Sequence, residues 1–595
     1  MCGIAGVISL SSPPDPRNAE RMAEVLAHRG PDDQGVWCDD RVALAHRRLA
    51  VIDPTPAGRQ PFTTPDGRFV LVYNGELYNE REIRAELEAE GIRFHTQCDT
   101  ETVLLSLARW GLQARAKLRG MYALALWDTQ DHRLLLGRDE LGVKPLYFAP
   151  ISEREFAFAS EPPALFQHPS VAPRPDPIAI AAYLSTIQIA VGRRTLFEGV
   201  GTLEPGEWLS IETTTGTLSA EVHPPEWNSC PSPEGTTGDV IRASAHLQLR
   251  ADVPTCCLLS GGLDSSVLSS LALEVLPRLD TYCAGARSGD SIGPTSEDFR
   301  YAREVSDHIG ARHTEAPVSR ELFLERWPQL IQRAGLPLCT PNEVAINEVA
   351  RTLRADGKVV TLSGEGADEL FAGYTLPLML AHEHVASNDD QSSDALHFLT
   401  TIRWAHPTQL GALLADTNVE EEVGPWIAGL HADSIEQTDR DFPTLSDSDR
   451  RLCSIVGMQR RVNLPNLLRR LDQATMLESV EGRTPYADRV VARHAETLPL
   501  NTRFRPDPAA PGTKLALRSA FANCLPASVV SRPKASFPLP FESWLDGATH
   551  ALDGSFARAW FTPDAREQLR TDPKGLFTVA WPVLNIAMWG ERWWG

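Results

Sequence analysis

Two different hydrophobic patterns divide this chain, and the change from one to the other limits the folds that it can adopt. Before residue 213 the apolar runs are short and separated by Gly, Pro and Asp, as in RFVLVYNGELYN and MYALALWD, which is typical of strands. After a connector rich in Pro, Ser and Gly, HPPEWNSCPSPEGTTGD, the strand-like run VPTCCLLS is followed by the turn GGLD and the helical pattern SSVLSSLALEVL. Strands that alternate with helices in this way indicate a parallel sheet.

The chain of 595 residues is too long for a single hydrophobic core, so the two patterns predict two large units. We expect an α+β sandwich at residues 1–213, a linker at 214–236, and an α/β parallel-sheet unit at 237–595. Helical periodicity over Ser446–Leu477 and Lys514–Asn523 predicts that the second unit has a helical C-terminal part.

The acidic balance of the chain excludes some partners. Its 57 basic and 78 acidic side chains give a net charge of -21. Such a field repels phosphate backbones and anionic bilayers, so we expect no nucleic-acid partner and no membrane partner. Any polyphosphate ligand must therefore be held locally, by backbone N–H groups, lysine or a metal.

The cysteines indicate a reducing compartment. There are 10 of them, with no CxxC pair, and Cys256 and Cys257 are adjacent within an apolar run. Buried thiols of this kind favour an intracellular protein over a disulfide-stabilised secreted one. The sequence shows no basic leader segment and no apolar stretch long enough to span a bilayer. We therefore expect a cytoplasmic protein.

A cysteine directly behind the initiator methionine is chemically useful only if the rest of a site follows. The motifs HRGPDDQG, AHRRLAVID, YNGELYN, CDTE and GRDELGVKPLYF follow in order. Together with Cys2 they resemble the glutaminase domain of the N-terminal-nucleophile amidotransferases, over roughly residues 1–210. The resemblance implies an N-terminal-nucleophile sandwich in which the Cys2 thiol attacks glutamine. The α-amine freed by removal of Met1 has a pKa near neutrality and can take the thiol proton.

The same resemblance assigns the other glutaminase residues. A tetrahedral oxyanion needs preorganised N–H donors, and this role falls to the Asn74 side chain and the Gly75 backbone. Glutamine is a zwitterion, so the resemblance implies that Arg48 binds its carboxylate and that Glu76 and Asp99 bind its ammonium group. The expected glutamine-binding set is Arg48, Val51, Asn74, Gly75, Glu76 and Asp99.

The segment LLSGGLDSS, between the first buried strand and its helix, has the features of a phosphate-binding loop. Gly261 and Gly262 let backbone N–H groups face outward, and the helix N-terminus adds positive potential. The hydroxyls of Ser260, Ser265 and Ser266 can donate to phosphate oxygens. No GxxxxGK[ST] is present, so a Walker-type ATPase is not supported. The loop resembles that of ATP pyrophosphatases, which release pyrophosphate and leave an adenylate.

A second Gly-rich loop, LSGEGADELFAGY, belongs to another strand–loop–helix unit. We expect Asp264 and Asp368, one from each loop, to hold Mg²⁺, which takes carboxylate and phosphate oxygens. With LPNLLRRLDQATMLESVEGRTPYAD, TKLALRSAF and RPKASFPLPFESWL, nearly the whole chain resembles the asparagine synthetases. That resemblance implies that Glu365 supports adenylation and amination and that Lys514 stabilises the departing pyrophosphate. The ATP-binding set that it implies is Leu258, Ser260, Gly261, Gly262, Asp264, Ser265, Ser266, Ala284, Ser363 and Gly364.

The two halves together imply a glutamine-dependent, AMP-forming carbon–nitrogen ligase. Ammonia made at Cys2 would pass internally to an acyl-adenylate and displace AMP, leaving an amide. A dry passage would deliver neutral ammonia and protect the adenylate from water. The expected small-molecule partners are glutamine, ATP and a carboxylic acid such as aspartate, and a homodimer is compatible with the resemblance.

Two positions depart from the asparagine synthetase pattern. Gln473 follows Asp472 where an arginine is usual, which changes the local charge. The segment AGLPLCTPNEVAINEVA stands where the family recognises aspartate and does not closely follow the usual form. Aspartate, giving asparagine, is the first choice of acceptor, and a carboxylic acid of specialised, antibiotic-like metabolism is the alternative.

Two other readings remain open. The β-lactam-forming synthetases resemble the second half, but they tend to lose the N-terminal cysteine and use a tyrosine near the acceptor. This chain keeps Cys2 and has no tyrosine between Tyr301 and Tyr374, which disfavours ring closure. A non-catalytic regulatory protein that binds glutamine and ATP would need the same pockets, and turnover separates it from an enzyme.

Overall fold

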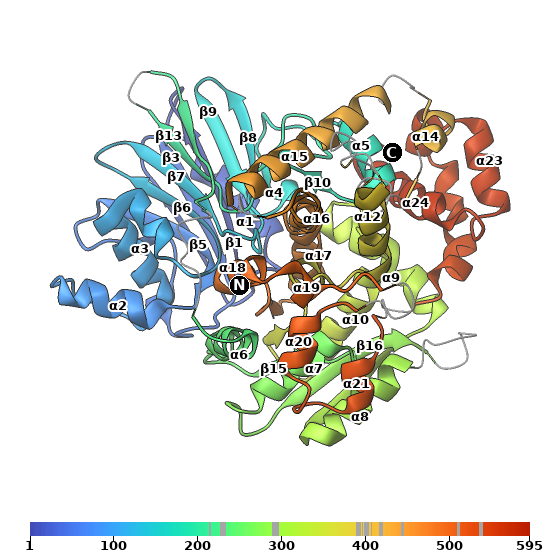
Figure 1. The fold of residues 1–595 in the computed structure, drawn as a ribbon. Coiled ribbons are helices and arrows are strands. Elements are labelled where there is room, and N and C mark those ends of the chain that lie inside the picture. The colour runs from blue at the N-terminus through green and yellow to red at the C-terminus, as the bar shows by residue number, and fades with distance from the viewer. Residues whose placement is uncertain are drawn as a thin grey trace.

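The computed structural model describes residues 1–213, 216–226, 234–287, 297–387, 394, 397, 404–405, 407–415, 420–441, 445–507, 512–534 and 539–595. The first part of the chain forms two antiparallel sheets, and the second is built around a parallel sheet with helices packed about it (Figure 1). Both the α+β sandwich and the α/β unit with a helical C-terminal part are therefore confirmed.

The first antiparallel sheet carries Cys2 at the start of a central strand. Cys2 lies opposite Arg48 in the register of β1 with β3, so the expected nucleophile and the expected carboxylate-binding cation start out as neighbours. In spatial order its strands are β10 (Ala190–Val191), β11 (Arg194–Thr195), β12 (Gly201–Thr202), β8 (Tyr147–Ser152), β9 (Glu155–Ala159), β1 (Cys2–Ser9), β3 (Val42–Arg48) and β2 (Asp33–Cys38).

The second antiparallel sheet carries Asn74 and Gly75 towards the C-terminal end of its strand Phe69–Leu77. In spatial order it consists of β14 (Ser219–His223), β13 (Trp208–Glu212), β7 (Arg133–Arg138), β6 (Gly120–Asp128), β5 (Phe69–Leu77) and β4 (Phe62–Thr63). β14 lies inside the segment expected to be a linker. Because it pairs with β13 along its full length, the antiparallel unit continues to His223.

The two sheets pack face to face over an apolar layer. Ile4, Val72, Ala125 and Leu136 belong to this layer and are fully buried. The helical segments of this unit are α1 (Pro16–Val25), η1 (Pro56–Gly58), α2 (Glu80–Ala89), α3 (Asp99–Trp110), η2 (Gly111–Ala116), α4 (Pro162–Leu165) and α5 (Pro177–Thr186).

The parallel sheet places the two Gly-rich loops side by side. Its order is β17 (Arg312–Val318), β16 (Asp280–Ala286), β15 (Thr255–Leu258), β18 (Val360–Leu362) and β19 (Glu481–Arg483). β15 and β18 are adjacent and parallel, so the loops that follow them leave the same edge of the sheet. The helices of this part are α6 (Thr237–Gln248), α7 (Leu263–Ala272), α8 (Glu297–Ile309), α9 (Arg320–Ala334), α10 (Asn342–Ala355), α11 (Ala367–Leu370) and α12 (Thr375–Ser387).

The helix expected over Ser446–Leu477 is present as a nearly continuous rod. It consists of α16 (Asp447–Met458), a π-helical segment η6 (Gln459–Asn463) and α17 (Leu464–Met476). The helix expected over Lys514–Asn523 is shorter, at α20 (Leu515–Ala520), because Lys514 has a left-handed φ of 53° and forms the N-cap. The remaining helices are α14 (Pro407–Leu413), α15 (Glu420–Asp441), α18 (Arg489–Thr497), α19 (Leu500–Arg503), α21 (Ala527–Ser531), η7 (Phe541–Asp553), α22 (Ser555–Trp560), α23 (Pro563–Thr571) and α24 (Phe577–Trp594).

The two units share buried apolar surface. α24 packs against α9 through stacked Trp327 and Trp581, whose ring centroids are 4.6 Å apart, and the same core extends to Tyr183 of α5. Within the described ranges no helix is both long and apolar enough to cross a bilayer.

Candidate active sites

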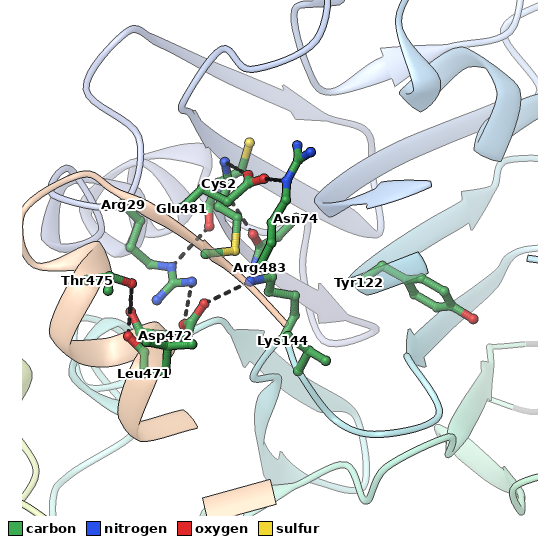
Figure 2. Close-up of polar contacts among 12 residues, drawn as sticks. Cys2, Arg29, Asn74, Tyr122, Lys144, Leu471, Asp472, Thr475, Glu481 and Arg483 are labelled. Carbon is green, nitrogen blue, oxygen red and sulfur yellow. Dashed lines mark hydrogen bonds and ion pairs between the residues drawn. The ribbon is translucent and has the colours of Figure 1, made fainter. Parts of the chain in front are cut away.

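Two side chains, those of Asn74 and Arg29, hold the backbone of Cys2 at the start of β1. Its backbone N–H donates to Asn74 Oδ1 at 2.9 Å, and its carbonyl accepts Arg29 Nε at 3.0 Å (Figure 2). The residue is 7% exposed. Burial raises the pKa of the thiol, an effect that the nearby N-terminal amine opposes. The thiol therefore needs a base to become a nucleophile at neutral pH.

Asn74 has a free donor beside Cys2. Its Oδ1 holds the Cys2 N–H, while its Nδ2 is buried and has no hydrogen-bond partner. A buried orphan donor is uncommon, and it suits an oxyanion that appears only during the reaction. A Cβ on Gly75 would overlap Met121 O and the backbone of Tyr122, so only glycine fits on β5 at this position.

A small cavity of about 20 Å³ gathers the expected glutamine-binding residues. Its walls include Cys2, Arg48, Val51, Gly75, Glu76 and Asp99, so of the predicted set only Asn74 stands outside the lining. Arg48 is oriented by backbone carbonyls: its guanidinium donates to Thr55 O at 2.8 Å and to Asp53 O at 2.6 Å.

The two acids expected to bind an ammonium group are both buried. Burial raises the pKa of Glu76, and Glu481 adds to this effect while Arg483 opposes it. Burial also raises the pKa of Asp99, which accepts the N–H of Leu77 at 2.9 Å. A cationic ligand would favour the charged form of both acids.

The chain that the structure describes still carries Met1, and this residue is part of the same site. The Met1 α-ammonium lies 2.7 Å from Glu481 Oε2, and the side chains of both residues are fully buried. Glu481 also contacts Arg483 Nε at 2.6 Å. Burial disfavours the charged carboxylate, but the N-terminal ammonium and Arg483 outweigh it and lower the pKa of Glu481 to about 2.

A network of buried charges continues from Cys2 into α17 (Figure 2). Arg29 contacts Glu161 at 2.8 Å and Asp472 at 2.9 Å, in addition to its bond to the Cys2 carbonyl. Lys144 Nζ lies 3.2 Å from the other carboxylate oxygen of Asp472. Because a buried charge is costly without its partner, these contacts fix the start of β1 relative to α17.

A separate cavity of about 230 Å³ opens at the carboxyl edge of the parallel sheet. It gathers both Gly-rich loops and most of the expected nucleotide residues. Those that line it are Leu258, Ser260, Gly262, Asp264, Ser265, Ala284, Ser363, Gly364, Glu365, Asp368 and Lys514.

Two members of the expected ATP-binding set lie outside this lining. Gly261 has a φ of 69°, and a Cβ there would overlap Tyr301, so the glycine shapes the turn. Ser266 is fully buried, and its hydroxyl donates to Gly262 O at 2.7 Å. The hydroxyls of Ser260 and Ser265 lie 3.2 Å apart at the mouth of the loop.

The acids expected to hold Mg²⁺ share a charged cluster with two lysines. Lys514 Nζ lies 2.5 Å from Asp264 and 2.7 Å from Asp368, and Lys534 Nζ lies 2.5 Å from Asp368. Asp264 Oδ1 is buried and has no hydrogen-bond partner. Two carboxylates with a free oxygen fit a Mg²⁺ that takes its other ligands from phosphate and water. No third His, Cys, Asp or Glu joins them in a metal-ligating group within the part of the chain that is described.

Burial and the neighbouring charges together shift the pKa values of Asp264, Asp368 and Lys534. Burial disfavours the charged form of Asp368, but Lys514 and Lys534 outweigh it and lower its pKa to about 2. For Asp264 burial dominates and raises the pKa, with Lys514 opposing. Burial opposes the charge of Lys534, but Asp368 and Asp264 raise its pKa.

Glu365 contacts α17 in the wall of the nucleotide cavity. Its carboxylate lies 2.6 Å from Arg470 Nη2, and Arg470 also donates to Thr340 at 3.0 Å. Two residues further along α17, Asp472 contacts Arg29 beside Cys2. α17 therefore reaches both sites.

Sequence patterns did not assign Arg29, Lys534, Arg470 or Glu481. Lys534 lies in the motif RPKASF and Arg470 lies in LLRR, so these two motifs could have identified both residues. Glu481 is 480 positions from Met1, and no local pattern predicts that contact.

Two family profiles match the chain in succession. The profile for a glutamine amidotransferase domain matches residues 1–221, and the profile for asparagine synthase matches residues 236–590. The chain belongs to the asparagine synthase family. The membership makes it an enzyme of the glutamine-hydrolysing asparagine synthetase class, a group of carbon–nitrogen ligases.

Curated relatives of this asparagine synthase family enzyme extend over most of its length. Asparagine synthetase [glutamine-hydrolyzing] 1 of Bacillus subtilis is 30% identical over 576 residues, which covers 92% of this chain and 88% of that protein. Asparagine synthetase [glutamine-hydrolyzing] 3 of the same organism is 28% identical, covering 90% of this chain and 87% of that protein. Amidase chry2 of Gibberella zeae is 28% identical, covering 63% of this chain and 59% of that protein.

Proposed function

We propose that this asparagine synthase family enzyme uses glutamine and ATP to convert a carboxylic acid to its amide, with aspartate as the first choice of acid. The observation that carries the proposal is the convergence of the site residues on two separate cavities. Each site also has a buried polar atom without a partner. Asp264 Oδ1 belongs to the lining of the nucleotide cavity, and Asn74 Nδ2 lies beside Cys2, outside the lining of the glutamine cavity. Such atoms suit charges that arrive with the substrates.

In the first half-reaction glutamine is hydrolysed at Cys2 after Met1 has been removed. The freed α-amine of Cys2 takes the thiol proton, and the sulfur forms a bond to the amide carbon. Asn74 Nδ2 and the Gly75 N–H stabilise the oxyanion. The C–N bond breaks, ammonia leaves with the transferred proton, and water cleaves the thioester to glutamate. The balance is glutamine plus water giving glutamate plus ammonia.

In the second half-reaction a carboxylate oxygen of the acid bonds to the α-phosphorus of ATP. The bond from that phosphorus to the bridging oxygen breaks, and pyrophosphate leaves beside Lys514 and Lys534. When bound by Asp264 and Asp368, Mg²⁺ would neutralise phosphate charge. Ammonia then adds to the acyl carbon, AMP departs, and Glu365 takes the proton that the nitrogen loses.

Residues of the acceptor segment support a second candidate for the acid. Asn342, Ile346 and Val349 line the nucleotide cavity, and they present one amide and two hydrocarbon side chains. Free aspartate carries three charged groups, whereas these three residues of the acceptor segment offer none, and the charges of the cavity come from other elements, such as Glu365 and Arg470. A less polar carboxylic acid from specialised metabolism therefore remains the alternative to aspartate.

The decisive experiment measures pyrophosphate release with ATP, glutamine and a panel of acids, with mass detection of the amide. Asparagine as the product supports aspartate, and another amide supports the alternative. Release that does not depend on an acid contradicts amide synthesis. No release with any acid of the panel favours a binding protein that does not turn over. The homodimer stays a prediction.

A Cys2→Ala variant tests the division between the two sites. It should lose glutamine-dependent synthesis and keep synthesis from added ammonium, because the second cavity is intact. If ammonium does not rescue the variant while the variant remains folded, the division is wrong. Asp264→Asn should have the reverse effect, with pyrophosphate release lost and glutamine hydrolysis retained.

A further inference from the structure

A third cavity, of about 320 Å³, lies between the two units and is separate from both sites. One side is formed by the glutaminase unit, with Arg138, Tyr147 and Val191. The other side is formed by α15, η6 and α17, with Leu430, Val462 and Arg469. It is larger than the nucleotide cavity, and the two share no lining residue in the described parts of the chain. Its size is within the range of small-molecule sites.

Two arginines in the wall are buried without a carboxylate partner. Arg138 is 5% exposed, and its guanidinium donates to the backbone oxygens of Gly142, Lys144 and Leu203. Arg469 is 6% exposed and donates through Nη2 to Asn466 Oδ1 at 2.5 Å. Neither forms an ion pair with any carboxylate that the structure describes.

One nitrogen of Arg469, Nη1, is buried and forms no hydrogen bond with the part of the chain that the structure describes. Burial opposes the charge of the guanidinium, but Tyr147, Cys339 and Glu343 nearby raise its pKa. Arg29 and Arg483, which are buried at the same interface, are different, because Arg29 contacts Glu161 and Asp472, and Arg483 contacts Glu76 and Glu481. Buried cations in folded proteins are normally paired. Among the described residues no carboxylate forms an ion pair with Arg469, so its Nη1 is open to an anionic ligand.

The remaining walls favour an anion of low charge and give it a hydrocarbon part. Glu140, Glu204 and Asp433 also line the cavity, and these three acids, which Arg460 and Arg461 of the same lining partly balance, oppose a ligand with several negative charges. Val191, Leu430 and Val462 supply apolar surface. A planar guanidinium recognises a carboxylate with two oxygens better than it recognises a neutral group.

We propose that this cavity binds an organic monocarboxylate, whose carboxylate accepts Arg469 Nη1 beside the positive charge of Arg138. Its hydrocarbon part lies against Val191, Leu430 and Val462. α17 carries Arg469 on the side of this cavity and Arg470 on the side of the nucleotide cavity, where Arg470 holds Glu365. One helix therefore contributes to the walls of both cavities.

The test uses the full-length enzyme without nucleotide and titrates butanoate, hexanoate and octanoate by calorimetry. Hexanol and inorganic phosphate are the matched probes for the hydrocarbon part and for the charge alone. We expect saturable binding of the monocarboxylates, tighter with the longer chains, and no binding of hexanol or phosphate. Binding of phosphate but not of the monocarboxylates, or binding of none, overturns the proposal.

Two variants locate the binding. Arg469→Gln removes the charge and should weaken monocarboxylate binding at least about tenfold. Leu430→Trp fills the cavity from α15, where the wild-type side chain is half-buried, and should abolish binding while glutamine hydrolysis and the melting temperature stay unchanged. Unchanged binding in Leu430→Trp places the ligand elsewhere and overturns the proposal, even if Arg469→Gln fails to fold. The binding readout does not depend on the enzyme's acceptor acid.

Discussion

The α-ammonium of Met1 and the carboxylate of Glu481 form an ion pair of 2.7 Å in which neither side chain is exposed. The two residues belong to different units, so the start of the glutaminase sheet is anchored by β19 of the parallel sheet. Glu481 in turn contacts Arg483, and Arg483 contacts Glu76 in the glutamine cavity. The second unit therefore completes the electrostatic surroundings of the first.

Glu481→Gln should lower the stability of the whole enzyme and its glutaminase activity together. The substitution leaves Arg483 buried with only one of its two carboxylate partners, and loss of one partner from a buried pair costs about 3 kcal/mol or more. Urea unfolding and glutamate release measure the two effects. Glu478→Gln, whose partner Arg333 is half exposed, is the matched control and should change neither by much. A fully stable and active Glu481→Gln enzyme would show that the pair has no role.

Gly58→Ala should weaken glutamine binding and leave the synthetase site unchanged. A Cβ at this position would overlap Arg48 Nη2, so the guanidinium must leave the backbone carbonyls that orient it. We expect KM for glutamine to rise about tenfold or more, since a charge-assisted contact is lost, and ammonium-dependent synthesis to continue. Gly429→Ala on α15 has open space around its Cβ and serves as control. An unchanged KM would mean that Arg48 does not bind the glutamine carboxylate.

Lys534→Met should slow pyrophosphate release. Its ammonium contacts Asp368 at 2.5 Å on the opposite side from Lys514, so it is placed to meet charge on the leaving group. Removal of one such donor costs about a hundredfold in kcat. Single-turnover assays with ATP measure the step, and glutamine hydrolysis should persist. Lys574→Met, at an exposed position far along the chain, controls for loss of a lysine. A change in KM alone would assign Lys534 to ground-state binding.

Ionisation of the buried Glu343 carboxyl should lower the free energy of unfolding of the enzyme as the pH rises. Burial raises its pKa from 4.5 to about 7, with Arg470 opposing, while its carboxylate accepts the N–H of Cys339. The folded state thus binds the proton more tightly than the unfolded state, so the stabilisation is present below pH 4.5 and lost as the pH rises to 7. The loss is of order 3 kcal/mol.

Glu343→Gln removes this group without changing its shape. The variant should match the wild type at pH 4.5 and be more stable than it at pH 8, in urea unfolding at both values. Glu348→Gln on the same helix is the control. It should show the same difference in stability between pH 4.5 and pH 8 as the wild type, because Glu343 is still present. Equal pH dependence in Glu343→Gln and the wild type would contradict the prediction.

The fold class and most of the site could be read from the sequence because the signals are local. Cys2, Asp264 and Asp368 each lie in a short motif, and parallel pairing of β15 with β18 then brings the two acids together. Ser266 was assigned to phosphate because of its place in SGGLDSS, whereas its hydroxyl donates to the carbonyl oxygen of Gly262, the N-cap residue of α7. Helical geometry, rather than residue type, decides that outcome.

The contacts between the two units could not be predicted in this way. Arg29 and Asp472 are 443 positions apart, and each looks like an ordinary surface charge in its own segment. Their burial depends on how the sheets and α17 pack, which no periodicity encodes. The linker expected at 214–236 shows the same limit, because β14 is a polar edge strand with exposed side chains that only its pairing with β13 defines.

The proposed glutaminase chemistry requires removal of Met1, and the closed position of this residue limits when removal could take place. An aminopeptidase needs a terminus that reaches into its own active site, and a terminus that is 1% exposed beneath β19 does not. Residue 481 leaves the ribosome long after residue 2, so trimming has a time window during synthesis that ends when the later half folds over the earlier one. Chains that miss this window would keep an intact nucleotide site and produce no ammonia of their own.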